Sequence, residues 1–116
     1  MLKLTGKSGK TYTFHICEFD TMEAIDKACE KFTPAGLYVF AYRYIKQGDA
    51  RNWYDLKYIG ETGNYSERDY SNHHKKEEIV KAKCNAWGYC TTTCSEKDRL
   101  AQESDLIENY NPPFNG

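Results

Sequence analysis

Two tyrosines, Tyr38 and Tyr58, are spaced so that their hydroxyl groups could act on the same molecule. Residues 36–45 alternate as a strand does, so every second side chain shares one face. A second strand is predicted over 53–60, and a hairpin centred on Gly48 would place Tyr38 opposite Tyr58. Cross-strand partners point to one side of a sheet, so the two phenols would converge. Simple packing is the alternative, because the chain contains ten tyrosines.

A carboxylate, Glu103, is expected on the apolar face of the helix predicted to begin after Ser95. At ~100° per residue, Glu103 falls near the centre of an arc that includes Leu100 and Ile107. A carboxylate that faces a core is costly unless a metal ion, a cation or several donors satisfy it. The alternative partner is Arg99, one turn earlier on the same helix.

Basic side chains follow the second strand. The segment after this strand leads into a helix predicted over 64–84, which Thr62 or Asn64 could cap, with an interruption near Ser71-Asn72. Arg68 would lie about one turn inside that helix, on a side that could face the sheet. His73 and His74 follow within two turns, although a lone histidine is more often an ordinary residue than a catalyst.

The other elements predict an α+β fold. Alternation over residues 2–19, on either side of a turn at 7–10, indicates a hairpin rather than a phosphate-binding loop. A helix should start at Asp20 or Thr21 and end at Pro34. Further predicted elements are a short strand and a final helix, over 87–93 and 95–110.

Composition restricts the function classes. The chain has 116 residues, one domain in length, with 16 basic and 17 acidic residues and a net charge of −1. A nucleic-acid partner would therefore need a local basic groove. No apolar run suits a membrane span or a signal peptide, so we expect a cytoplasmic protein without a membrane partner. Five cysteines lacking paired C-x-x-C spacing indicate reduced thiols rather than a zinc site.

Taken together, these residues resemble the GIY-YIG endonuclease family. The first motif corresponds to Gly36-Leu37-Tyr38, and the second to Tyr58-Ile59-Gly60. The positions that follow in the family are matched, in chain order, by Thr62, Asn64, Arg68, then His73 or His74, then Glu103 followed by Leu106 and Ile107, and finally Pro112 and Asn115.

The resemblance implies a small central antiparallel β-sheet flanked by helices. The nuclease-like core would span 34–116, and an added N-terminal hairpin and helix, 1–33, would pack on the same domain. Nineteen residues separate Tyr38 from Tyr58, more than is usual in the family, which fits a longer hairpin arm in contact with substrate.

The implied activity is a DNA endonuclease reaction, with phosphodiester hydrolysis at a single metal ion. Glu103 would hold Mg²⁺ or Mn²⁺, and Arg68 would grip the phosphate. Tyr38 would activate or position the attacking water, and Tyr58 would orient it. Supporting roles fall to His73 as a catalytic neighbour, to Asn115 as an anchor or phosphate ligand, and to Lys57, Arg43 and His74 as substrate-binding residues.

The expected partner is DNA, with branched or otherwise structured DNA among the candidates. Near-neutral charge suggests that a homodimer or a separate DNA-targeting partner helps to hold it. Two rival interpretations stay open at this point. One is a catalytically silent module of the same fold that binds nucleic acid or a protein, and the other is a structural domain with packing tyrosines.

Overall fold

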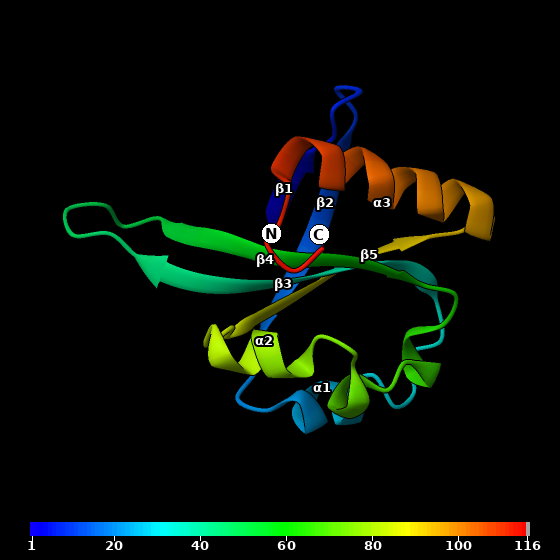
Figure 1. Cartoon of the computed structure of the whole chain (residues 1–116), viewed down its shortest axis with the longest axis horizontal. Coiled ribbons are helices and arrows are strands. Elements are labelled where there is room, and N and C mark those ends of the chain that lie inside the picture. Colours follow the sequence, from blue (N-terminus) through cyan, green and yellow to red (C-terminus); the bar gives the residue numbers. More distant parts are fainter. Residues whose placement is uncertain (116) are drawn as a thin grey trace.

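The computed structural model describes residues 1–115 and shows a five-stranded antiparallel sheet flanked by helices (Figure 1). The strands follow the order β1-β2-β5-β3-β4 across the sheet. The predicted α+β class is confirmed. The elements are β1 (Leu2–Thr5), β2 (Thr11–Glu18), α1 (Met22–Ala28), β3 (Ala35–Ile45), β4 (Asn52–Thr62), the 3₁₀ helices η1 (Tyr65–Glu67) and η2 (Tyr70–Asn72), α2 (Lys76–Lys81), β5 (Ala86–Thr92) and α3 (Glu96–Tyr110).

The sheet lies between two layers of helix. Helix α3 covers one face, and α1 and α2 cover the other (Figure 1). Strand β3 alternates accordingly: Tyr38 and Phe40 point into the cluster under α1 and α2, whereas Leu37 and Val39 pack with Leu106 of α3. The face that bears the predicted catalytic tyrosines is therefore the face covered by the shorter helices.

Residues 1–33 contribute directly to this sheet. Strand β2 pairs with β5, so the N-terminal hairpin extends the same sheet as the residues after 34. Helix α1 adds Met22 and Ile25 to the cluster that contains Tyr38. It ends at Ala28, earlier than the predicted stop at Pro34.

The β3–β4 register differs from the predicted one. Tyr38 pairs with Gly60, and Phe40 pairs with Tyr58. The pairing of Tyr38 with Tyr58 is therefore wrong, because the turn is not centred on Gly48 and an irregularity at Lys57 adds a residue to β4. The shift is two residues, so Tyr38 and Tyr58 still share a face, with ring centroids 6.1 Å apart.

The long helix predicted over 64–84 is absent from the structure. Its place is taken by η1, η2 and the six-residue α2. Arg68 and His73 both have extended or non-helical backbone angles at the ends of the 3₁₀ helices. Arg68 thus lies in a connection between turns rather than inside a helix.

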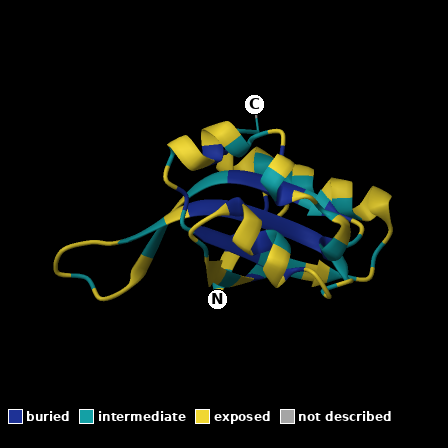
Figure 2. Ribbon diagram, turned by 90° about the horizontal axis from the view of Figure 1, so that it is seen from below, coloured by how far each residue is buried: buried dark blue, intermediate teal, exposed yellow. Residues whose placement is uncertain are grey.

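The distal part of the β3–β4 hairpin projects from the body as an arm (Figures 1 and 2). Its residues are mostly exposed or half-buried, in contrast to the buried central parts of the same strands (Figure 2). Across residues 1–115, no helix is long and apolar enough to cross a membrane.

Gly60 gives a first prediction, because a Cβ atom there would lie 2.3 Å from Cζ of Tyr38. Gly60→Ala should therefore lower the free energy of unfolding by about 1–3 kcal/mol through overpacking. Gly63→Ala is the matched control, since its Cβ would meet only the Arg99 guanidinium, at 3.4 Å. Urea unfolding measures both, and equal stability of the two variants would contradict this packing role.

Candidate active site

The Tyr38 hydroxyl is the centre of a buried hydrogen-bond network. Tyr38 is fully buried, and its oxygen accepts a hydrogen bond from Nη2 of Arg68 at 2.9 Å. Nε2 of His73 lies 2.8 Å from the same oxygen. Three sequence-predicted site residues, from β3, the end of η1 and the end of η2, are thus brought together.

Backbone contacts indicate which nitrogen of His73 carries the proton. The N–H group of Lys75 donates to Nδ1 of His73 at 3.0 Å, so Nδ1 is an acceptor. In neutral imidazole the proton is then on Nε2, which donates to Tyr38. Burial, with the charges of His74, Arg68 and Lys75, lowers the pKa of His73 to about 4. His73 is therefore neutral at pH 7, and Tyr38 keeps its own proton free to donate.

Tyr58 and His74 form the more open part of the site. Nε2 of His74 lies 3.4 Å from the Tyr58 hydroxyl. The two histidine rings stack with centroids 4.6 Å apart, and His74 is exposed whereas His73 is buried. The sequence could not choose between the histidines; the structure gives His73 to Tyr38 and His74 to Tyr58.

Electrostatics favours a positioning role for Tyr38 over a base. Burial raises the pKa of Tyr38, and the charge of Arg68 opposes this only in part. Burial also raises the pKa of Tyr58, reinforced by the charge of Glu103 and opposed by Arg68. Both phenols are therefore protonated near neutral pH and act as hydrogen-bond donors and acceptors.

Glu103 is half-buried on α3, which Ser95 caps as predicted. Fewer buried apolar side chains flank Glu103 than the helix pattern predicted, because Leu100 is 44% exposed. No hydrogen bond or ion pair links the Glu103 carboxylate to another of residues 1–115. Burial and the nearby charge of Glu61 raise the pKa of Glu103, and Arg68 lowers it.

Arg99 does not neutralise Glu103. Its Nε instead lies 3.1 Å from Oε2 of Glu61 on β4, in a well-shielded ion pair. Glu61 is a site residue that the sequence reasoning missed. It directly follows the Tyr58-Ile59-Gly60 motif, and this position was the only signal for it. The structure thus sets the carboxylates of Glu61 and Glu103 near each other, with Arg68 near Glu103.

The remaining predicted residues lie outside this network. Lys57, at the β4 irregularity, pairs with Asp55 at 2.9 Å. Arg43 is on the odd-numbered face of β3, away from Tyr38, and pairs with Glu18. Asn115 donates to and accepts from the backbone of Ile59, at 2.7 and 2.8 Å. Asn115 therefore anchors the C-terminal segment along the free edge of β4.

Helix α1 holds the histidine-bearing turn in place. The Asp26 carboxylate accepts hydrogen bonds from the backbone N–H groups of Tyr70 and Ser71, at 2.6 and 3.0 Å. The Tyr70 ring packs edge-on against Tyr38, with centroids 5.4 Å apart. Neither Asp26 nor Tyr70 was identified from sequence, since their roles depend on contacts between distant segments.

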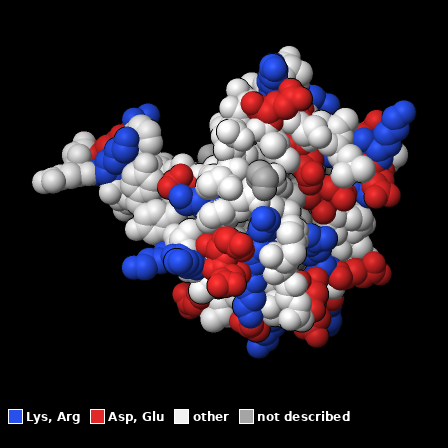
Figure 3. All heavy atoms as spheres, in the orientation of Figure 1, with Lys and Arg blue, Asp and Glu red and all other residues white. Residues whose placement is uncertain are grey.

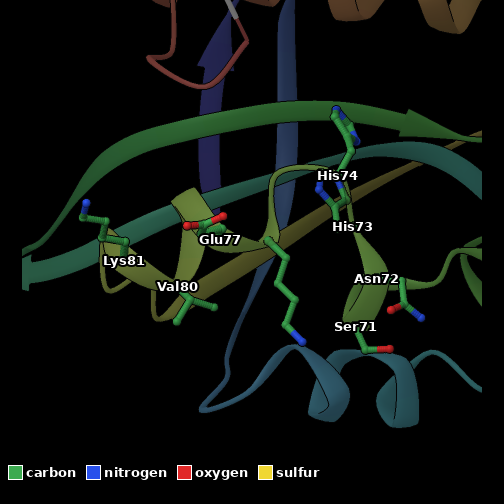
Figure 4. Close-up of a pocket in the computed structure, with 8 residues that line it drawn as sticks. Ser71, Asn72, His73, His74, Glu77, Val80 and Lys81 are labelled. Atoms are coloured by element: carbon green, nitrogen blue, oxygen red, sulfur yellow. The ribbon is translucent and has the colours of Figure 1, made fainter.

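Surface grooves lead to the two histidines. A hollow of about 340 Å³ is lined by Arg68, His73 and His74 together with neighbouring residues of 67–72. A second hollow, of about 740 Å³, extends from the histidines past Ser71 to Glu77 and Lys81 of α2 (Figure 4). Basic and acidic side chains are interspersed on the face in Figure 3, and neither sign covers it.

The available carboxylates suit a metal ion that keeps most of its water ligands better than one enclosed by protein ligands. Among residues 1–115, no three His, Cys, Asp or Glu side chains gather so that they could hold a metal ion. Glu103 offers one carboxylate that lacks a protein partner, near the charge of Glu61. Mg²⁺ keeps several waters and binds through one or two carboxylates plus substrate phosphate, so it fits such a site.

Comparison with protein-family models, with curated proteins and with solved structures finds no match for this chain. Its function is therefore inferred from its own residues and their geometry.

The buried His73 predicts a pH dependence of stability. An unfolded histidine takes up a proton near pH 6.5, whereas folded His73 resists protonation down to about pH 4. The unfolded state thus binds more protons between these values, and stability falls as pH falls through this window. Acidification from pH 7 to 4.5 should cost about 2–3 kcal/mol through His73.

Urea unfolding at several pH values measures this effect. His73→Gln should lose less stability on acidification than the unaltered protein, because it removes the titrating group. Exposed His15→Gln is the matched control and should keep the full dependence. Identical pH profiles for the protein and His73→Gln would contradict the buried neutral state.

Proposed function

We propose that this protein is a divalent-metal-dependent endonuclease with a GIY-YIG-type site that hydrolyses phosphodiester bonds in DNA. The observation that carries the proposal is the convergence of Tyr38, Tyr58, Arg68 and His73 near the half-buried carboxylate of Glu103. Packing tyrosines alone would not explain why an unpaired carboxylate lies beside this network.

Phosphate binding falls to Arg68. Its guanidinium donates to Tyr38 through Nη2, and its other N–H groups match the paired oxygens of a phosphate. Arg68 also lines the hollow beside His74, so a phosphate can approach it from solvent. Positive charge at this point stabilises the negative charge that develops on the phosphate during hydrolysis.

Water positioning falls to the phenols. Tyr38 accepts from two donors, Arg68 and His73, so its own hydroxyl proton can be donated to Tyr58, to a water or to a phosphate oxygen. Tyr58 provides a second hydroxyl on the same face. Neutral His73 fixes the orientation of Tyr38, and exposed His74 lies beside the Tyr58 hydroxyl.

Glu103 is the residue proposed to hold Mg²⁺ or Mn²⁺. A bound divalent cation would supply Lewis-acid stabilisation of the leaving oxygen. On the protein side, a cation would offset the burial and the repulsion from Glu61 that together raise the pKa of Glu103. Asn115 has a supporting role, because both ends of its amide are committed to Ile59.

Glu103→Gln tests the metal ligand. The raised pKa means that ionised Glu103 costs stability at pH 7, so this variant should be at least as stable as the unaltered protein. DNA cleavage in Mg²⁺ should nevertheless be lost. Mg²⁺ should raise the melting temperature of the unaltered protein and leave that of Glu103→Gln unchanged.

Glu108→Gln on the same helix is the control, since Glu108 is exposed and makes only a 3.9 Å ion pair with Lys7. It should cleave and respond to Mg²⁺ normally. Branched, single-stranded and duplex DNA serve as substrates, each with Mg²⁺, Mn²⁺ or EDTA. Binding without cleavage under every condition would favour the catalytically silent module instead.

Arg68 gives an independent test of the same site. Arg68→Ala should lower the cleavage rate by about 10²–10³, in line with the loss of one charge-stabilising donor. Arg68→Lys retains the charge without the paired donors and should recover only part of the rate. Single-turnover cleavage assays compare them, and an unchanged rate in Arg68→Ala would remove Arg68 from the mechanism.

A further inference from the structure

The projecting arm carries a group of aromatic side chains that take no part in the hydrogen-bond network around Tyr38. Tyr42 and Tyr44 lie on the same face of β3 as Tyr38, because all three positions are even. Their rings stack with centroids 5.9 Å apart and planes 16° from parallel. Trp53 pairs with Tyr44 across the hairpin and so adds a third aromatic ring to this face.

Positive charge accompanies these rings. Nζ of Lys46 lies 3.7 Å from the centroid of the Trp53 ring, and Cζ of Arg51 lies 5.1 Å from it. Arg51 also pairs with Asp49, whereas Lys46 has no ion-pair partner within the described chain. Residues 42–57 contain four Lys or Arg and two Asp, in a chain of net charge −1. The positive excess is small and concentrated at Lys46, because the other three basic side chains pair with carboxylates.

The arm is separated from the hydrophobic core, so packing does not account for its aromatic content. Tyr42 is 40% exposed although a strand could place a polar residue there. Both views show the arm leaving the body without a helix against it (Figures 1 and 2). At ~3.3 Å per residue, Tyr42 lies about 13 Å along β3 from Tyr38, and Tyr44 about 20 Å.

We propose that this arm binds a single-stranded segment of DNA next to the bond that the site cleaves. The inference rests on the proposed nuclease function and names its substrate class. Tyr42 is exposed, and Tyr44 and Trp53 are half-buried. Aromatic rings with neighbouring cations form a surface on which unpaired bases stack while phosphates are neutralised. Paired bases have no free faces to offer such rings, so a blunt duplex gains little from this surface. The shared face places the aromatic rings of the arm on the same side of the sheet as Tyr38.

Measuring DNA binding under conditions that prevent cleavage separates the contribution of the arm from that of the catalytic site. In EDTA, fluorescence anisotropy is measured with labelled oligothymidylate of about 16 nucleotides and with a blunt duplex of equal length. The unaltered protein should bind the single strand more tightly than the duplex. Tyr42→Ala should weaken single-strand binding about tenfold, as expected for one lost stacking contact. Lys46→Ala should weaken it and reduce its salt dependence.

The arm supplies its own matched controls. Tyr54 lies on the opposite face of the same arm, so Tyr54→Ala should leave single-strand binding unchanged. Lys97→Ala, at an exposed position on α3, is the control for Lys46→Ala and should leave single-strand binding unchanged. Circular dichroism checks that each variant is folded, and exposed Lys46→Glu provides a second test if Tyr42→Ala is unstable. Equal effects on the two faces of the arm would overturn the proposal.

Failure of the arm and failure of the nuclease function can be told apart. If Tyr42→Ala and Lys46→Glu bind and cut like the unaltered protein, the arm proposal is wrong while the nuclease stands. If cleavage never occurs but Tyr42→Ala weakens strand binding, the nuclease proposal fails and the arm remains a DNA-binding surface. The remaining outcome is that the protein does not bind single-stranded DNA but forms a dimer that exposed Ile45→Asp dissociates. The arm would then be a contact with a second copy of the chain.

Discussion

Burial of the Tyr38 hydroxyl is the constraint on which the rest of the site depends. A phenol inside the core needs hydrogen-bond partners, and Arg68 and His73 supply them. Its ring fits only because Gly60 has no side chain. Tyr70 then packs on the ring edge, and Asp26 of α1 fixes the backbone around Tyr70. The N-terminal segment thereby helps to define a site to which it contributes no predicted catalytic group.

Arg68 has a second role as the charge that balances this site. It opposes the effect of burial on Tyr38, Tyr58 and Glu103, and it favours the neutral form of His73. One cation therefore acts on two phenols and on the Glu103 carboxylate, while the neighbouring Glu61 already has Arg99 as partner. Glu103 is left as the least compensated charge. This imbalance, more than the tyrosines, distinguishes the arrangement from ordinary aromatic packing and makes it suited to a cation and a phosphate.

Local patterns predicted the strands and the last helix well, because alternation and the Ser95 cap are encoded in neighbouring residues. The helix over 64–84 was wrong because tertiary contacts override propensity there: the buried Tyr65 hydroxyl donates to the backbone of Leu37, at 2.5 Å, and Asp26 binds the next turn. The predicted β3–β4 register was wrong for a related reason, since the irregularity at Lys57 leaves no sequence signature. Tyr38, Arg68 and His73, which the structure brings into contact, were nevertheless identified as candidates from the order of residue types along the chain. The Arg99 partner was not, since Glu61 lies on another element.

Charge and aromatic content together determine how such a site could hold DNA. A chain of net charge −1 with interspersed surface charges gains little general attraction to a polyanion. Under the proposed function, phosphate contacts would be confined to Arg68 and the arm, so affinity would have to come from contacts that need no large positive field. Base stacking is such a contact, because it depends on ring faces rather than on net charge. The arm could supply this contact, because it groups Tyr42, Tyr44 and Trp53 on the same side of the sheet as Tyr38.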